Sequence, residues 1–108
     1  MTLQEIRDCL ERSPVIAAVP NNMLSLALES PVDIIFNLKV SILEIEECIK
    51  KAHQKGKRIF VHIDLADGIG KDKMGVQYLA GLGVDGIIST RAQLICYAKE
   101  SVLITVQR

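Results

Sequence analysis

The stretch Val61-His62-Ile63-Asp64-Leu65-Ala66-Asp67-Gly68-Ile69-Gly70-Lys71-Asp72 decides the fold of this chain. Residues 58–64 predict a buried strand, because isoleucine or valine occupies every second position and falls on one face. The other face begins with Phe60 and turns polar at His62 and Asp64. A glycine-rich turn and the start of a helix follow. A histidine and an aspartate at the carboxyl end of such a strand lie where parallel α/β proteins place their binding groups.

Length and composition predict one folded domain over residues 1–108. The hydrophobic share of 49% excludes a disordered chain. Lys plus Arg and Asp plus Glu each total 13, so the chain lacks the overall basic charge of a general nucleic-acid coat. Its three cysteines form no CxxC pair, which indicates neither a disulfide framework nor a zinc site. Cys9 and Cys48 fit helical core positions.

Targeting signals are not found in the sequence. No apolar run approaches the ~20 residues of a membrane span. The first residues are polar and acidic, unlike the basic start of a signal peptide. We therefore expect a cytoplasmic protein.

Strands and helices alternate along the chain. The sequence predicts a leader helix over residues 1–12, which Pro14 ends. The expected strands are Val15–Val19, Val32–Leu38, Arg58–Asp64, Asp85–Thr90 and Val102–Val106. The expected helices are Met23–Ser30, a helix from Ser41 to Gly56, Lys73–Leu82 with Met74, Leu79 and Leu82 inward, and a helix capped by Thr90.

Connections this short between strands require parallel crossovers. Either an open doubly wound sheet or part of a (β/α)8 barrel satisfies this order. The barrel is favoured because the strands end in polar residues that would ring a common mouth, namely Asn37, His62, Asp64, Ser89, Thr90 and Gln107. Five strands do not close a barrel, since closure needs about eight. We therefore expect the front part of a TIM-type barrel, truncated after about five strands.

Several segments together resemble the bacterial glycerol-3-phosphate-responsive antiterminators, the glycerol uptake operon regulatory proteins. The resemblance lies in residues 13–19, 58–65 with 67–72, 85–90 and 105–108. It implies a TIM-type barrel that binds glycerol-3-phosphate and acts on the leader of glycerol-operon messenger RNA, letting transcription pass a terminator. Members of the family are about twice as long, and the part beyond residue 108 would hold the last strands and the loops that commonly grip phosphate.

In this context the candidate ligand site centres on His62 and Asp64, which would hydrogen-bond to the hydroxyls of a small polyol phosphate. The alternative is a buried polar pair that satisfies itself. The other candidate ligand-binding residues are Asp67, Lys71, Asp72, Ser89, Arg91, Gln107 and Arg108. For these the alternatives are an ordinary turn with Asp72 as N-cap, capping by Thr90, and a free terminus.

Two other kinds of site are rejected. The glycine-rich turn at residues 68–71 lacks the GxxxxGK[ST] spacing of a nucleotide-hydrolase loop. The second histidine, His53, lies on a polar helix end, so a third nitrogen ligand for a metal is missing. We expect no metal and no cofactor.

For RNA contact the sequence offers a basic cluster near the end of one helix. Its members are Lys50, Lys51, Lys55, Lys57 and Arg58. Cations at a helix carboxyl end are also explained by the helix dipole alone, and this alternative is favoured. Binding to RNA phosphates would weaken as salt rises.

Three functions remain open. The first is a non-enzymatic, glycerol-3-phosphate-responsive, RNA-binding transcription antiterminator. The second is a barrel enzyme for a phosphorylated polyol or triose, with Asp64 or His62 as base. The third is an inactive truncated remnant. The open edges of the first and last strands also predict a homo-oligomer.

Overall fold

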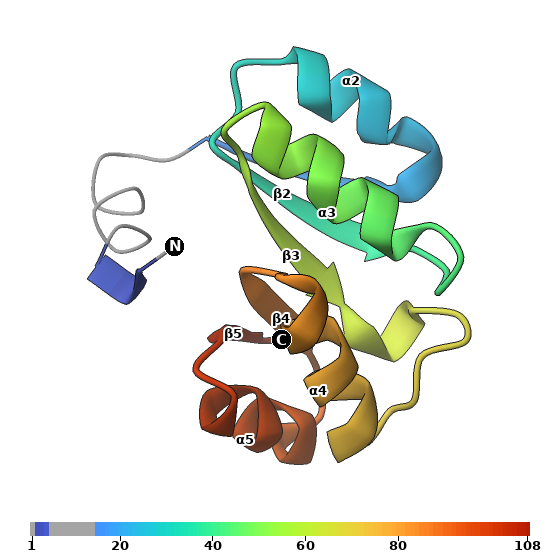
Figure 1. Cartoon of the computed structure of the whole chain (residues 1–108), viewed down its shortest axis with the longest axis vertical. Helices are drawn as coiled ribbons and strands as arrows, with labels where there is room; N and C mark the ends of the chain where they lie inside the picture. Colours follow the sequence, from blue (N-terminus) through green and yellow to red (C-terminus); the bar gives the residue numbers. More distant parts are fainter. Residues whose placement is uncertain (1, 5–14) are drawn as a thin grey trace.

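The computed structural model of the chain describes residues 2–4 and 15–108. The predicted leader helix therefore lies mostly outside the described residues, as does Cys9. Five strands and their connecting helices alternate (Figure 1). In chain order they are β1 (Ile16–Pro20), the 3-10 turn η1 (Asn21–Met23), α2 (Leu24–Glu29), β2 (Ile34–Lys39), α3 (Ile45–Gln54), β3 (Arg58–His62), the 3-10 turn η2 (Ile63–Leu65), α4 (Lys73–Leu82), β4 (Gly86–Ser89), α5 (Ala92–Glu100) and β5 (Ile104–Gln107).

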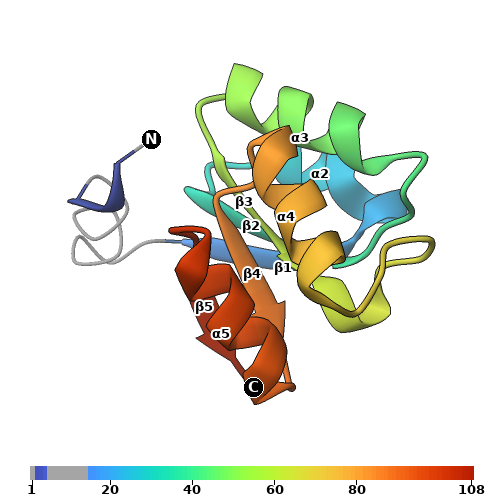
Figure 2. The same cartoon turned by 60° about the horizontal axis from the view of Figure 1, so that its bottom comes forward.

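All five strands form one parallel sheet in the order β1-β2-β3-β4-β5. The parallel arrangement expected from the short connections is confirmed. Each new strand adds beside the previous one, so the order never reverses as it does in a doubly wound sheet. Figure 2 shows α5 lying along β5, and these two elements are the last in the described chain.

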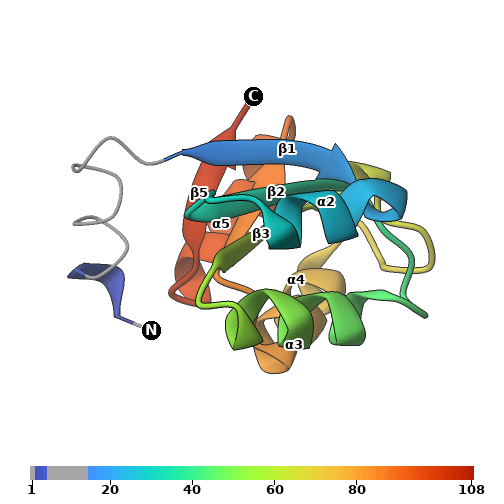
Figure 3. The same cartoon turned by 90° about the horizontal axis from the view of Figure 1, so that it is seen from above.

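The four helices pack on one side of this sheet. The main core cluster joins Leu28 of α2, Cys48 of α3, Leu79 of α4 and Ala98 of α5 to alternate strand residues such as Ile59. Cys48 is a core residue, as predicted. Figure 3 shows α3 and α4 together on the same side of β1 and β2. We call this side of the sheet the helix side.

The opposite side, here called the inner face, has its own small apolar cluster. Its residues are Ile34, Phe60 and Ile88, with Phe36, Ile104 and Val106 packed against them. The rings of Phe36 and Phe60 lie 5.1 Å apart, a normal separation for an aromatic pair. Gly86 makes room for Phe60, because a Cβ there would lie 2.6 Å from that ring. In the described part of the chain, this cluster contains no helix residue.

Helix α4 has the bounds that the sequence predicts. The Asp72 carboxylate accepts a 2.9 Å hydrogen bond from the Gly75 N–H, and Gly83 ends the helix with a φ of 96°. The predicted inward position of Met74 is wrong, since its side chain is 72% exposed. Val76, two positions further along, is buried instead, so the apolar stripe of α4 is formed by Gly75, Val76 and Leu79.

Two other predicted boundaries are corrected. Strand β3 ends at His62, and Asp64 lies in the turn η2 rather than on the strand. Thr90 does not cap α5, because Arg91 is the N-cap and no side chain there bonds to the helix. The Thr90 hydroxyl instead donates a hydrogen bond to the Asp64 carboxylate. None of the helices in residues 2–4 and 15–108 is long and apolar enough to cross a membrane.

Candidate functional site

The carboxyl ends of β3 and β4 bring polar side chains together. Asp64 follows β3 in the turn η2, while Ser89 ends β4 and Thr90 comes next. Because β3 and β4 pair in parallel, their carboxyl ends meet at the same edge of the sheet. The sequence distance between Asp64 and these two residues is 25 and 26 positions, so the contact is made by the fold.

The Asp64 carboxylate accepts three hydrogen bonds. The Ser89 hydroxyl donates at 2.7 Å, and the N–H and hydroxyl of Thr90 each donate at 2.8 Å. Burial acts to raise the pKa of Asp64, but these hydrogen bonds and the nearby His62 outweigh it and lower the pKa below its ordinary value of 3.8. The carboxylate is therefore ionised at neutral pH.

His62 is 4% exposed and lies on the inner face, since it pairs with Ile88 of β4. Its Nδ1 atom is buried and has no hydrogen-bond partner within the described residues. A buried polar atom without a partner costs about 1–3 kcal/mol, so it is rare in folded proteins.

The predicted ring of polar strand ends facing one mouth is wrong in part. Asn37 alternates with Phe36 and therefore points to the helix side, where its amide donates to Asn21 at 3.0 Å and to the Cys48 sulfur at 3.2 Å. Ser89 alternates with Ile88 in the same way. Successive side chains of a strand point to opposite faces of the sheet, so a polar residue near a strand end faces the inner side only at every second position.

A network that the sequence did not indicate lies at the ends of β1 and β2. Asn37 is fully buried and holds Asn21, whose own amide donates to the Glu44 carboxylate at 3.0 Å. Burial raises the pKa of the Cys48 thiol, more than its bond from Asn37 lowers it. These contacts fix the β1 and β2 loops against α3. The only sequence signal for them was the polar residue Asn37 in an apolar strand.

The polar side chains of the loop between β3 and α4 have partners within the chain. The Lys71 ammonium donates to the carbonyls of Ala66 and Ile69. Asp67 forms an exposed ion pair with Lys39 at 3.2 Å. Of the three predicted ligand residues in this loop, Asp72 caps α4 and the other two have the partners just named.

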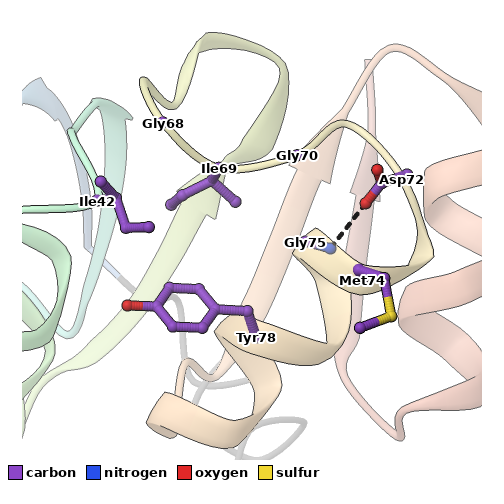
Figure 4. Close-up of a pocket in the computed structure, with 8 residues that line it drawn as sticks. All are labelled: Ile42, Gly68, Ile69, Gly70, Asp72, Met74, Gly75 and Tyr78. Carbon is purple, nitrogen blue, oxygen red and sulfur yellow. Dashed lines mark hydrogen bonds between the residues drawn. The ribbon is translucent and has the colours of Figure 1, made fainter.

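Gly68 of this loop and Gly75 of α4 allow close packing of the chain. A Cβ on Gly75 would lie 1.8 Å from the Gly70 carbonyl oxygen, and a Cβ on Gly68 would lie 2.6 Å from the Ile42 side chain. Figure 4 shows Ile42, Ile69 and Tyr78 around the hollow that results, with the Asp72–Gly75 hydrogen bond at its side. The hollow measures about 330 Å³. Its lining is mainly apolar, so it differs from a phosphate cradle of backbone N–H groups.

The remaining predicted ligand residues lie at the carboxyl ends of β4 and β5. Arg91 is exposed at the start of α5, and Gln107 is exposed at the end of β5. The Arg108 backbone N–H donates to the Ser89 carbonyl at 3.0 Å. Its side chain lines a second hollow of about 270 Å³ on the inner face, with Phe36 and Val106 among its neighbours.

The predicted RNA-binding cations are divided by the fold. Lys57 is buried, and its ammonium donates to the carbonyls of Ser30 and Val32 at 2.7 and 2.8 Å. Lys50 and Lys51 are exposed on α3. The two remaining members differ again, because Lys55 pairs with Glu29 at 3.3 Å and Arg58 lies half-buried on β3.

The second histidine lies at the opposite, amino-terminal edge of the sheet. The His53 ring nitrogen lies 2.8 Å from the buried Asp85 carboxylate, which also accepts from the Ile59 N–H at 2.9 Å. Among residues 2–4 and 15–108, no group of three or more metal-ligating side chains comes together.

Comparison with known proteins places the chain among its relatives. The family model of glycerol-3-phosphate responsive antiterminators matches residues 15–108. The chain is 38% identical over 92 residues to the uncharacterized protein YgcP of Escherichia coli (strain K12), a match that covers 83% of this chain and 48% of that protein.

Two solved structures are also similar. One is a glycerol uptake operon antiterminator-related protein of Thermotoga maritima, with a TM-score of 0.77, 27% identity and coverage of 88% of this chain and 54% of that one. The other is a glycerol uptake operon antiterminator regulatory protein of Listeria monocytogenes, with a TM-score of 0.79, 27% identity and coverage of 87% and 52%. The chain thus spans about half the length of these relatives. It belongs to the family of glycerol-3-phosphate responsive antiterminators.

Proposed function

We propose that this chain carries the effector-sensing site of a regulator that binds glycerol-3-phosphate and acts on the messenger RNA leader of glycerol uptake genes. Membership of the antiterminator family supports the effector and the regulatory role. The observation that carries the proposal is the buried Nδ1 atom of His62, which has no hydrogen-bond partner in the part of the chain that the structure describes and lies near the Asp64 carboxylate. A protein that acts on transcripts during their synthesis would work in the cytoplasm.

The chemistry of these two groups suits a polyol. A carboxylate offers about four acceptor positions, and Asp64 uses three of them within the chain. The remaining position is available to a glycerol hydroxyl. The Nδ1 atom of His62 can bond to a second hydroxyl, as donor or acceptor according to its tautomer. The internal bonds of Asp64 hold the acceptor in place before the ligand arrives, which lowers the entropy cost of binding.

The phosphate requires further groups. Arg91 and Arg108 are exposed near the same edge, and a guanidinium pairs well with a phosphate. The relatives are about twice as long, so we propose that the five strands form the first part of a barrel whose later loops complete the phosphate site. The strand order and the helix side of the sheet support this arrangement.

The enzymatic alternative has less support. A general base works best with a pKa near the pH of the reaction. The pKa of Asp64 is instead lowered, and its oxygens already accept three hydrogen bonds. Turnover of glycerol-3-phosphate or a triose phosphate that Asp64→Ala abolishes would restore this alternative.

Titration calorimetry with glycerol-3-phosphate tests the effector site. We expect His62→Gln to weaken binding about tenfold, the effect of one lost hydrogen bond of about 1.4 kcal/mol. The matched control is His53→Gln, because His53 lies at the other edge of the sheet beside Asp85. Equal loss in both variants, or no binding by this chain and by the longer Escherichia coli relative, would contradict the proposal.

For RNA we propose contact through the exposed cations of α3, with Lys50 and Lys51 as the main members, joined by Lys55 and Arg58. Lys57 would act by holding β3 to the chain before β2. Replacing Lys50 and Lys51 by methionine should reduce the salt dependence of leader RNA binding by about two in the slope of log K against log salt. Lys99→Met on α5 is the control, since Lys99 is exposed on another helix. An unchanged slope would rule out this surface.

We also propose that this regulator forms a homo-oligomer. The outer edges of β1 and β5 have no neighbouring strand in the described chain. Such edges favour pairing between chains, so a homo-oligomer remains our expectation. Sedimentation across a range of concentrations tests it, and a monomer throughout would contradict it.

A further inference from the structure

A second cluster of charged side chains lies at the amino-terminal edge of the sheet, opposite the edge that carries Asp64. His53 comes from the end of α3, Arg58 begins β3, and Asp85 directly precedes β4. Together with Gly83, these residues line a hollow of about 360 Å³. The effector site proposed above uses none of them, so the function of this hollow is a separate question.

The His53 ring is held at one of its two nitrogen atoms. Its Nε2 atom lies 2.8 Å from the Asp85 carboxylate, which also accepts from the Ile59 N–H at 2.9 Å. An ionised carboxylate only accepts hydrogen bonds, so Nε2 carries the proton in this contact. No hydrogen bond joins the other nitrogen, Nδ1, to another described residue, and 39% of the side chain is exposed. Nδ1 is therefore available to a ligand.

Arg58 brings a cation to the same hollow. Its Nε atom is buried and has no hydrogen-bond partner within the described residues. Asp85 lines the hollow too, but its carboxylate is bonded to His53 and to the Ile59 N–H, and Arg58 makes none of the ion pairs found among residues 2–4 and 15–108. A guanidinium pairs well with the oxygens of a phosphate, often through two hydrogen bonds.

The surroundings of the hollow suit a polyanion. Lys50 lies three residues before His53 on α3, so the two share one side of the helix, and Lys55 follows the helix end. Both lysines are exposed. A second hollow of about 370 Å³ shares Gly83 and Asp85 with the first, which leaves room for a group attached to a bound phosphate.

We propose that the hollow at the amino-terminal edge binds one backbone phosphate of RNA, with the Arg58 guanidinium and the His53 Nδ1 atom as donors. Nδ1 donates when the ring is cationic. The inference rests on the RNA contact through α3 proposed above and names the point at which one nucleotide is fixed. Such a contact sets the position of the RNA without reading its sequence. RNA and effector then bind at opposite ends of β3.

Fluorescence anisotropy of the 108-residue chain with a short labelled oligouridylate tests the proposal. This probe suffices because phosphate contacts are independent of sequence. Arg58→Met should weaken binding about tenfold and lower the slope of log K against log salt by about one. His53→Gln should also weaken binding, although its amide still offers Asp85 a donor and so preserves the fold. Lys99→Met, on the exposed part of α5, is the control.

Two further variants separate a phosphate contact from a structural role. Arg58→Lys keeps the charge but loses the planar donor group, so it should recover only part of the affinity. The double variant of Arg58→Met and His53→Gln should lose less than the product of the two single losses, because both residues bind the same phosphate. Circular dichroism shows whether each variant folds. If Arg58→Met does not fold, Arg58→Lys and His53→Gln decide the question.

Other outcomes overturn the proposal. Unchanged affinity in Arg58→Lys and His53→Gln makes the cluster purely structural, and a double variant that loses the full product of the single losses removes the shared phosphate. A loss of glycerol-3-phosphate affinity in His53→Gln assigns the hollow to the effector instead.

Failure of this inference is distinguishable from failure of the proposed function. If replacing Lys50 and Lys51 by methionine weakens RNA binding while the Arg58 and His53 variants do not, only the phosphate site is lost. If the wild-type chain does not bind the oligouridylate, the RNA contact fails as well. The titration of His62→Gln with glycerol-3-phosphate still decides the effector site in either case.

Discussion

The Ser89 hydroxyl donates a 2.7 Å hydrogen bond to the Asp64 carboxylate and so ties the carboxyl ends of β4 and β3 together. Ser89 is fully buried, and its oxygen also accepts from the Arg91 N–H at 2.9 Å. One serine thus connects the turn after β3 to the start of α5. The relationship makes Asp64 both a structural residue and a candidate ligand group.

Replacing Asp64 by asparagine should lower the free energy of unfolding by about 1–3 kcal/mol, because donors on Ser89 and Thr90 lose their charged acceptor. Urea denaturation measures the change. Asp67→Asn is the control, since Asp67 forms an exposed pair with Lys39 whose loss should cost less than about 1 kcal/mol. Equal effects of the two substitutions would show that the hydrogen bonds to Asp64 contribute nothing special.

The stability of the chain should depend on pH through Asp64. Its pKa is lower in the folded chain than the ordinary value of 3.8, so the folded state binds this proton less tightly than the unfolded state. The contribution of the carboxylate is therefore fully present above the unfolded pKa and is lost as the pH falls through the lowered, folded value. Urea denaturation from pH 6 to about pH 2 should show the difference between wild type and Asp64→Asn shrinking at the acid end. A constant difference would contradict the lowered pKa.

Replacing Lys57 by methionine should destabilise the chain by about 1–3 kcal/mol, because the carbonyls of Ser30 and Val32 lose their donor. Chemical denaturation measures this effect, with Lys50→Met as the exposed control. A result within about 0.5 kcal/mol of the control would mean that water replaces the ammonium at no cost.

Two glycines of α4 should respond in opposite directions to alanine. Gly75→Ala forces a Cβ to within 1.8 Å of the Gly70 carbonyl oxygen and should cost about 3 kcal/mol or more. Gly81→Ala meets no atom within 4 Å and should stabilise the helix by about 0.5–1 kcal/mol. The two midpoints of thermal unfolding should move apart. If both variants change stability equally, the close contact between the β3–α4 loop and α4 is not required.

The sequence alone predicted the elements whose signals are local. The isoleucines and valines of β3 fixed the helix side of the sheet, and Asp72 with Gly83 fixed the ends of α4. Short connections fixed the parallel direction of the strands. These features depend on backbone geometry and on side-chain period, which neighbouring residues determine.

Local patterns gave a wrong result where a distant residue competes. Threonine is a favoured N-cap residue, but the Thr90 hydroxyl donates to Asp64 instead. The sequence predicts Lys57 as a member of a basic cluster, but its ammonium donates hydrogen bonds to the carbonyls of Ser30 and Val32, which precede β2. In both cases the partner lies at least 25 residues away, so a window of neighbouring residues does not contain it.

The sequence by itself determined that this chain forms parallel β/α units with a histidine and an aspartate at the carboxyl end of the third strand. Only the tertiary structure decided that Asp64 accepts hydrogen bonds from Ser89 and Thr90, and that His62 and Arg58 each have a buried nitrogen atom with no partner among residues 2–4 and 15–108. The physical reason is that hydrogen-bond satisfaction depends on which groups meet in space. Periodicity along the chain specifies the direction in which a side chain points. The packing of the strands decides which groups it meets there.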